Sequence, residues 1–260
     1  MDYKTILLLV LLASSAVAIQ IRTEINGVIE GQIEYVDYRN AVYDSPQEFK
    51  VALVNTGSVG CLARVRVDVM NGDKLVYSAW SRELPVESGS SELFTSYWQP
   101  NESGNYTGDV RIYQCNMIYD GPELNFSAVI SNKTAANPFE VKVNNNGDKI
   151  MVTVKSNVDL DGVAIIPEDY PLGWIVESSE VNLKKGEERT AEIRYSPGIW
   201  KPGDVKLLLS TSDGAYKASS TYRIREGSPY DVKDMLIFAL GLACILLAAA
   251  LVYTHYRRVK

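Results

Sequence analysis

Residues 48–55 read Glu-Phe-Lys-Val-Ala-Leu-Val-Asn, and apolar side chains alternate with polar ones over most of this stretch. The same alternation recurs in residues 63–70 (ARVRVDVM) and in residues 149–155 (KIMVTVK). Because successive side chains of a strand point to opposite faces, this two-residue period predicts strands with one buried face. These segments therefore predict an all-β fold.

Turn sequences separate the alternating runs. Asn71-Gly72, Asn146-Gly147-Asp148 and Asp213-Gly214 each stand between two such runs, and these dipeptides favour β-hairpins. Between the two ends of the chain, no segment sustains a 3.6-residue period over three helical turns. Many short strands joined by hairpins favour β-sandwiches over a parallel sheet.

Apolar segments at both ends predict a membrane topology. Residues 235–253 (MLIFALGLACILLAAALVY) would span about 28 Å as a helix, close to the ~30 Å hydrocarbon core of a bilayer. Residues 5–12 (TILLLVLL) are too short to span, and Ala16-Val17-Ala18 matches a signal-peptidase site. We therefore predict a cleaved signal peptide and one transmembrane helix.

Basic residues orient that helix. Arg257, Arg258 and Lys260 follow the apolar run, so the positive-inside rule keeps the C-terminus in the cytoplasm. The prediction is a type I single-pass protein of the cell membrane with its ectodomain outside.

The ectodomain of roughly 210 residues is long enough for two sandwiches. Its best boundary is the polar, small-residue stretch 131–138 (SNKTAANP). The predicted segments are a signal peptide (1–18), a first β-sandwich domain (19–130), a linker (131–138), a second β-sandwich domain (139–225), a juxtamembrane linker (226–234), the transmembrane helix (235–253) and a cytoplasmic tail (254–260).

Turn and packing motifs in both halves resemble known families. The order of residues 54–57 (VNTG), 87–89 (ESG), 94–106 (FTSYWQPNESGNY) and 110–113 (VRIY) resembles the CARDB type of immunoglobulin-like domain found on prokaryotic, especially archaeal, surfaces. Residues 171–174 (PLGW), 181–187 (VNLKKGE) and 195–197 (YSP) are similar to NEW3-like β-sandwich modules. The resemblance implies two tandem immunoglobulin-like β-sandwiches with an extracellular adhesive or spacer role, and it transfers no catalytic residue.

Three cysteines are present: Cys61 and Cys115 in the predicted ectodomain, and Cys244 in the predicted span. An oxidising compartment favours a Cys61–Cys115 disulfide, and two buried thiols are the alternative. Tyr113-Gln114-Cys115 resembles the Tyr-x-Cys of an immunoglobulin strand, but Cys61 follows the turn after residues 48–55. The bridge is therefore expected to join two loops at one tip.

Composition excludes several function classes. The net charge of −6 disfavours a nucleic-acid partner. The single histidine, His255, lies in the predicted tail, so the ectodomain lacks a Ser-His-Asp or Cys-His pair and a histidine metal site. A glycosidase would need two carboxylates facing each other across a cleft, and the acids here show no such spacing. We expect them to be solvated surface charges.

One spacing matches a calcium loop. Asn157, Asp159 and Asp161 alternate before Gly162, and Glu168 follows at the closing position. Strand-like sequences flank the motif, whereas an EF-hand has helices. A polar turn between strands is the alternative to this Ca²⁺ site, and no other cofactor is expected.

Four N-x-S/T sequons predict a glycan-covered region in the first domain and the linker. Their asparagines are Asn101, Asn105, Asn125 and Asn132.

Aromatic residues give two further expectations. Tyr35, Tyr38 and Tyr43 stand in a loop-like stretch. They would form either a platform that contacts protein or carbohydrate or the packing of an edge strand. The tryptophans are expected to supply two core residues per domain: Trp80, Trp98, Trp174 and Trp200.

These observations predict a non-enzymatic membrane protein whose ectodomain binds an extracellular protein or glycan. The alternative is an accessory subunit of a larger membrane complex, docking through its span and second domain. Ala239-x-x-x-Ala243 in the span would permit a close helix–helix partner in the lipid bilayer, although alanine is common in any span. A carboxylate-dependent glycan enzyme is a third and weaker alternative.

Overall fold

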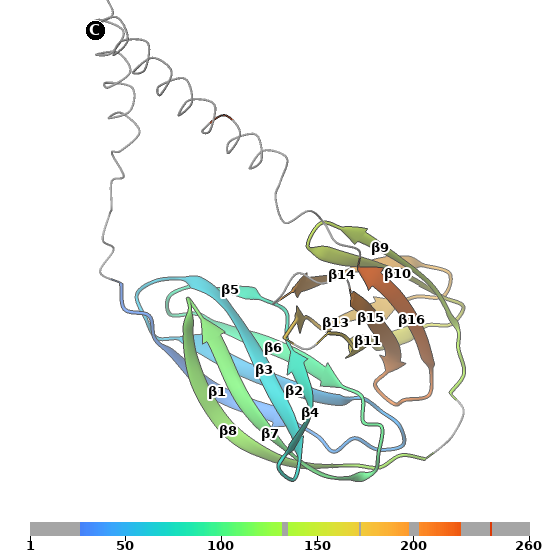
Figure 1. The fold of residues 1–260 in the computed structure, drawn as a ribbon, viewed down its shortest axis with the longest axis horizontal. Coiled ribbons are helices and arrows are strands. Elements are labelled where there is room, and N and C mark those ends of the chain that lie inside the picture. Colours follow the sequence, from blue (N-terminus) through green and yellow to red (C-terminus); the bar gives the residue numbers. More distant parts are fainter. Residues whose placement is uncertain (1–26, 132–134, 172, 198–202, 225–239, 241–260) are drawn as a thin grey trace, which may run out of the picture.

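The computed structural model describes residues 27–131, 135–171, 173–197, 203–224 and 240. Within these residues the chain forms sixteen strands in four sheets. Residues 31–128 form an N-terminal unit and residues 139–224 form a C-terminal unit beside it (Figure 1). The predicted all-β class is confirmed.

Two antiparallel sheets make up the N-terminal unit. The first sheet has the order β1 (Gly31–Tyr38), β2 (Gln47–Asn55), β6 (Ser91–Trp98). The second has the order β4 (Lys74–Trp80), β3 (Cys61–Asn71), β7 (Gly104–Gln114), β8 (Met117–Ala128), with the short β5 (Leu84–Val86) paired to β3.

The C-terminal unit repeats this plan. One sheet has the order β12 (Ile175–Val176), β14 (Glu188–Ser196), β10 (Lys149–Ser156), β9 (Phe139–Asn146). The other has the order β13 (Ser179–Leu183), β11 (Leu160–Asp169), β15 (Gly203–Thr211), β16 (Lys217–Ile224).

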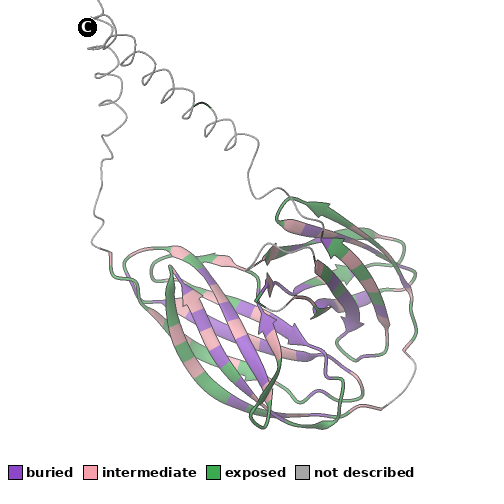
Figure 2. Ribbon diagram, viewed as in Figure 1, coloured by how far each residue is buried: buried purple, intermediate pink, exposed green. Residues whose placement is uncertain are grey.

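Alternating side chains build the two apolar cores. In β10, Ile150, Val152 and Val154 are fully buried, whereas the residues between them are partly exposed. Each core receives side chains from both sheets of its unit, as in a β-sandwich. Figure 2 shows the buried residues alternating with exposed ones along the strands. The period read from the sequence therefore reflects burial against a facing sheet.

The predicted hairpins are confirmed. Asn71 pairs with Lys74 across the β3–β4 turn, and Asn146 pairs with Lys149 across the β9–β10 turn. Gly72 and Gly147 have φ values of 59° and 69°, which these tight turns require and glycine adopts without steric cost.

The stretch around Tyr35 and Tyr38 is a strand, which corrects the loop expectation. It forms β1, which pairs with β2 through a register shift between Ile33 and Tyr35. A bulge of this kind breaks the two-residue period, which explains why the alternation was not visible. Tyr38 packs edge-to-face on Phe126 at 6.3 Å, whereas Tyr35 is exposed. Tyr43 lies after the strand and is also exposed.

Several predictions concern residues outside the part of the chain that the structure describes. The signal peptide (1–18), the tail (254–260) with Arg257, Arg258 and Lys260, and the span (235–253) apart from Leu240 lie outside the described residues. Among the residues that the structure does describe, no helix has the length and apolar character needed to cross a membrane. At the predicted linker, β8 ends at Ala128 and β9 begins at Phe139.

Candidate functional site: the seam between the two units

The C-terminal unit packs against the side of the N-terminal unit where β4 and β6 are edge strands (Figure 1). Edge strands present N–H and C=O groups that lack a neighbouring strand. We call the contact between the two units the seam. Its apolar part covers β6, and its polar part covers the end of β4.

Four buried side chains form the apolar part of the seam. Tyr97 comes from β6, Ala164 and Ile166 come from β11, and Leu208 comes from β15. They form a cluster that is separate from the cores of the two units. The exposed fraction of Ile166 is 0%, so this position is as dry as a core position.

Burial on both faces explains an unusual run in the sequence. Val163 and Ile165 point into the C-terminal core, whereas Ala164 and Ile166, between and after them, point into the seam. A strand that is buried on both faces has a continuous apolar sequence rather than an alternating one. Residues 163–166 (VAII) and 207–209 (LLL) are therefore the sequence signal of the seam, which was not recognised from the sequence.

Backbone groups continue the contact at the end of β4. The carbonyl of Trp80 accepts hydrogen bonds from the amide of Ser178 (3.0 Å) and from its hydroxyl (2.9 Å). Trp80 also forms a parallel bridge with Glu177. The edge carbonyl of one unit is thus satisfied by the other, as a buried backbone group requires.

Glu177 places a carboxylate inside the seam. Only 3% of its surface is exposed, and its Oε1 accepts a hydrogen bond from the amide of Glu83 at 3.1 Å. Burial raises the pKa of Glu177, although the Glu83 amide and the charges of Arg194 and Arg64 act in the opposite direction.

Two tyrosines donate across the seam in opposite directions. The Tyr77 hydroxyl donates to the carbonyl of Pro167, and the Tyr170 hydroxyl donates to the carbonyl of Ser78 at 2.9 Å. Their rings meet edge to face at 6.3 Å. Burial raises the pKa of Tyr170 to about 12 and raises the pKa of Tyr77 as well, so both remain neutral donors at physiological pH.

Tyr97 joins the apolar and polar parts. Its hydroxyl hydrogen-bonds to Glu180 of β13 and lies 3.3 Å from Oε1 of Glu48 on β2. Burial and the hydrogen bond to Glu180 both raise the pKa of Tyr97. The neutral hydroxyl therefore stands between carboxylates of the two units.

A charged cluster supports Trp80 from the N-terminal unit. The Arg66 guanidinium lies 5.4 Å from the centre of the Trp80 ring, and its Nε donates to Asp68 Oδ1 at 2.8 Å. Ser78 donates to the same Asp68 oxygen. Burial by itself would lower the pKa of Arg66, but the hydrogen bond and charge of Asp68 outweigh it and raise that pKa. The cluster holds the Trp80 ring by a cation–π contact.

These interactions orient the two units relative to each other. The carboxylates Glu177 and Glu180 are engaged by an amide and a hydroxyl of the other unit. Among the residues that the structure describes, no three His, Cys, Asp or Glu side chains come together where they could hold a metal ion. The hydrogen bonds of Glu177 and Glu180 thus join the two units.

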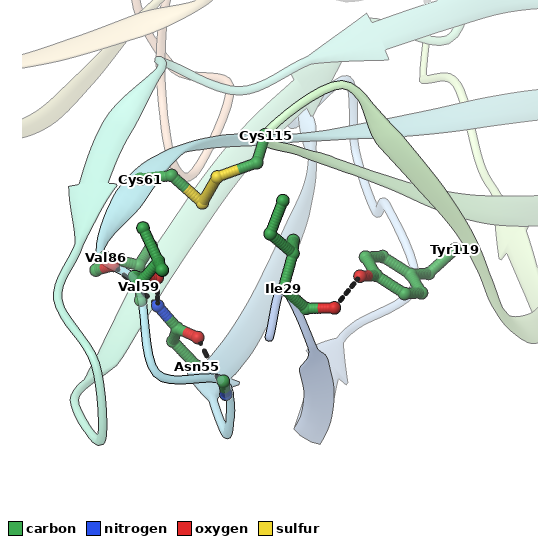
Figure 3. Close-up of a disulfide and its surroundings, with 8 residues drawn as sticks. Ile29, Asn55, Val59, Cys61, Val86, Cys115 and Tyr119 are labelled. Carbon is green, nitrogen blue, oxygen red and sulfur yellow. Dashed lines mark hydrogen bonds between the residues drawn. A yellow bond between two sulfur atoms is a disulfide. The ribbon is translucent and has the colours of Figure 1, made fainter. Parts of the chain in front are cut away.

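The Cys61–Cys115 disulfide is confirmed, with a Cα–Cα distance of 5.7 Å. Cys61 begins β3 and Cys115 lies in the turn between β7 and β8, so the bridge closes one end of the N-terminal unit (Figure 3). This is the tip position that the sequence predicted.

The structure does not bring the calcium-loop residues together. Asp161 and Glu168 lie near opposite ends of β11, with the paired segment 163–167 between them. Asp159 accepts the amide of Lys185 at 2.7 Å, and Glu168 pairs with Lys206 at 2.7 Å. Asn157 is exposed just before the strand. An extended segment separates the ligands that an EF-hand loop wraps around an ion.

Three of the predicted glycan acceptors lie on the surface of the N-terminal unit. Asn101 is exposed between β6 and β7, Asn105 is exposed on β7 and Asn125 is exposed on β8. Asn105 is opposite Ser127, and Thr107 is opposite Asn125, so two sequons interleave on neighbouring strands. Asn132 lies outside the described residues.

The tryptophan expectation holds for two residues and is wrong for a third. Trp98 belongs to the N-terminal core and Trp174 to the C-terminal core. Trp80 is buried instead in the seam, because the C-terminal unit covers the outer face of the edge strand that carries it. Trp200 lies outside the described residues.

No protein-family model matches the chain, and no curated protein matches it. Among solved structures, the chain is similar to a CARDB domain from Pyrococcus furiosus determined with di-metal ions. The identity is 18%, the match covers 39% of this chain and 93% of that domain, and the TM-score is 0.29.

Two other solved structures are also similar to the chain. The match to the YadV chaperone has 10% identity and a TM-score of 0.23, and it covers 73% of this chain and 98% of the chaperone. The match to red sea bream transglutaminase has 10% identity and a TM-score of 0.30, and it covers 77% of this chain but 32% of that enzyme. The NEW3-like resemblance of the second domain stays a prediction.

Proposed function

We propose that this chain is a non-enzymatic surface protein, tethered to the cell membrane by residues 235–253, whose two β-sandwiches act as one rigid binding unit. The partner is a protein or glycan outside the membrane. The observation that carries the proposal is the seam, because its apolar cluster and its hydrogen bonds fix the orientation of the two units.

Rigidity is useful for binding through two domains at once. A partner that contacts both units pays no entropy for ordering a hinge, so the affinity of the preorganised pair exceeds that of two loosely joined units. At the seam, the carboxylates of Glu177 and Glu180 accept hydrogen bonds from the N-terminal unit, and these bonds add to its rigidity.

The tether is tested on membranes that contain the full-length chain. We expect the chain to resist extraction with alkaline carbonate, and we expect protease added to intact cells to remove the described part. Complete extraction with carbonate would overturn the tether.

The binding role is tested by adhesion. Cells with the full-length chain should adhere to surfaces coated with cell-envelope material more strongly than cells without it. Pretreating the coated surface with protease or with glycosidase distinguishes a protein partner from a glycan partner. Equal adhesion with and without the chain would refute this role.

The accessory-subunit alternative makes a different prediction. A chain extracted in mild detergent would then have the native mass of a larger complex, and Ala239→Leu with Ala243→Leu would disrupt that complex if the span is the docking surface. A monomeric mass would count against it.

A further inference from the structure

Exposed apolar side chains gather around the disulfide. We call this set the disulfide tip, and its members are between 38% and 59% exposed: Val28, Ile29, Leu62, Met117 and Ile118. Exposed apolar side chains that lie close together at one end of a domain are a feature of protein or membrane interaction sites.

Local structure holds the tip rigid. Cys115 and Asn116 have φ values of 47° and 66°, the positive values that a two-residue hairpin turn requires at both central positions. The turn places Met117 and Ile118 at the start of β8. The amide of Cys115 bonds to the carbonyl of Leu62 at 3.3 Å, and the disulfide ties the same turn to the start of β3.

The segment before β1 completes the tip. The Tyr119 hydroxyl donates to the carbonyl of Ile29 at 3.3 Å, and Val28 exchanges hydrogen bonds with Ser58. Figure 3 shows Ile29 between the disulfide and Tyr119. Three chain segments therefore present their apolar side chains from one fixed end of the unit.

The number of residues before the predicted span limits how far the C-terminal unit can lie from the bilayer. The described chain ends its last strand at Ile224, and ten residues separate Ile224 from the predicted span at Met235. Ten residues reach at most about 36 Å, so the tether keeps the end of β16 near the bilayer. Figure 1 shows the end of β16, the β7–β8 turn and the start of β1 along the same upper side of the molecule.

The predicted glycan acceptors lie at the opposite end. Asn105 stands at the start of β7 and Cys115 follows its end, a separation of about 30 Å at the rise of an antiparallel strand. Asn101 and Asn125 lie near Asn105, since Asn125 pairs with Thr107. Hydrophilic glycans at this end point away from a bilayer that the disulfide tip would face.

We propose that the disulfide tip inserts its apolar side chains into the headgroup–acyl boundary of the bilayer that holds the chain's own span. The inference rests on the membrane tether proposed above. Insertion into this boundary region removes exposed apolar surface from water, as it does for interfacial amphipathic helices. The N-terminal unit then lies beside the C-terminal unit at the membrane, and the end with the predicted glycan acceptors projects outward.

The test places a tryptophan in the tip of the full-length chain reconstituted in bilayer vesicles. Ile118→Trp is compared with the matched variant Val76→Trp, which replaces an exposed apolar residue (39%) near the opposite end, at the start of β4. Both variants keep the native tryptophans, whose signal is subtracted with the unsubstituted chain. Vesicles carry lipids brominated on the acyl chain near the headgroup, which quench tryptophan on contact.

We expect the brominated lipids to remove about half or more of the added Ile118→Trp fluorescence, because an inserted side chain lies ~5–10 Å into the boundary region. The Val76→Trp signal should not change. Met117→Trp repeats the measurement at a second position, in case Ile118→Trp perturbs folding.

The outcomes separate the two proposals. A chain that resists carbonate extraction but leaves both tip tryptophans unquenched overturns the lipid contact and leaves the tether intact. Unquenched tip fluorescence with a blue-shifted emission means that protein covers the tip, and it overturns the lipid contact as well. A chain released by carbonate overturns both.

Discussion

The substitution Ile166→Ala tests whether the apolar cluster holds the two units together. Ile166 is fully buried against Tyr97, Ala164 and Leu208, so the change removes its contacts in the seam and leaves a cavity. Loss of three carbons at about 0.8 kcal/mol each, with a cavity contribution, predicts a loss of about 3 kcal/mol. The seam should therefore open about 100-fold more often, since 1.4 kcal/mol corresponds to a factor of ten.

Hydrogen exchange measures this opening directly in the full-length chain embedded in lipid nanodiscs. The reporters are the amides of Ser178 and Glu83, which bond across the seam to Trp80 and Glu177. Their exchange should accelerate by about the same 100-fold, because exchange from a closed joint follows the free energy of its local opening.

Ile165→Ala is the matched control. Ile165 precedes Ile166 in the same strand and is equally buried, but it faces the C-terminal core. This change should accelerate exchange throughout β10 and β14 of the C-terminal unit, whereas Ile166→Ala should leave those strands protected. Unchanged exchange of Ser178 and Glu83 in Ile166→Ala would refute the apolar cluster as the source of the joint.

Three further predictions follow from the same structure. Burial raises the folded-state pKa of Glu177 above its reference value of 4.5. The contribution of Glu177 to stability is therefore full below pH 4.5 and declines as the pH rises through the folded-state pKa. Glu177→Gln should remove this decline in urea unfolding measured across that pH range, and a decline that persists in the variant would assign it to another group. Tyr97→Phe keeps the ring in the apolar cluster but removes the hydrogen bond to the Glu180 carboxylate, so it should weaken the seam by about 2 kcal/mol in the exchange assay. A loss as large as that of Tyr97→Ala would contradict separate contributions of the ring and the hydroxyl. Replacing Cys61 and Cys115 by serine removes a crosslink between residues 54 positions apart, and in the chain-entropy model this should destabilise the N-terminal unit by about 4 kcal/mol. Thermal melting of the variant and of the wild type, with and without reductant, measures the loss. A wild-type melting temperature that does not respond to reduction would contradict it.

Local patterns predicted much of the fold because local interactions create them. Gly72 and Gly147 gave the correct hairpins, since glycine adopts the positive φ of a tight turn without steric cost. Alternation located β2, β3 and β10, because each strand faces a core on one side and polar surroundings along much of the other. The tip position of the disulfide followed from the place of Cys61 after a predicted turn.

Predictions failed where a second element decides what a residue faces. The bulge after Ile33 hid β1, because the register of β1 depends on its pairing with β2. The motif Asn157–Glu168 matched a calcium loop by spacing, but pairing with β13 and β15 holds its second half extended. Trp80 was expected in a core, and the C-terminal unit buries it in the seam.

The sequence by itself determined the all-β class, the hairpins and the end of the sandwich that carries the disulfide, since these depend on period and turn chemistry within a few residues. Only the tertiary structure decided the seam and the residues that it buries. The residues 163–166 show why: their apolar run is compatible with any partner on the second face. Which surface meets that face depends on non-local contacts between β11 and Tyr97 of β6, which lie far apart along the chain.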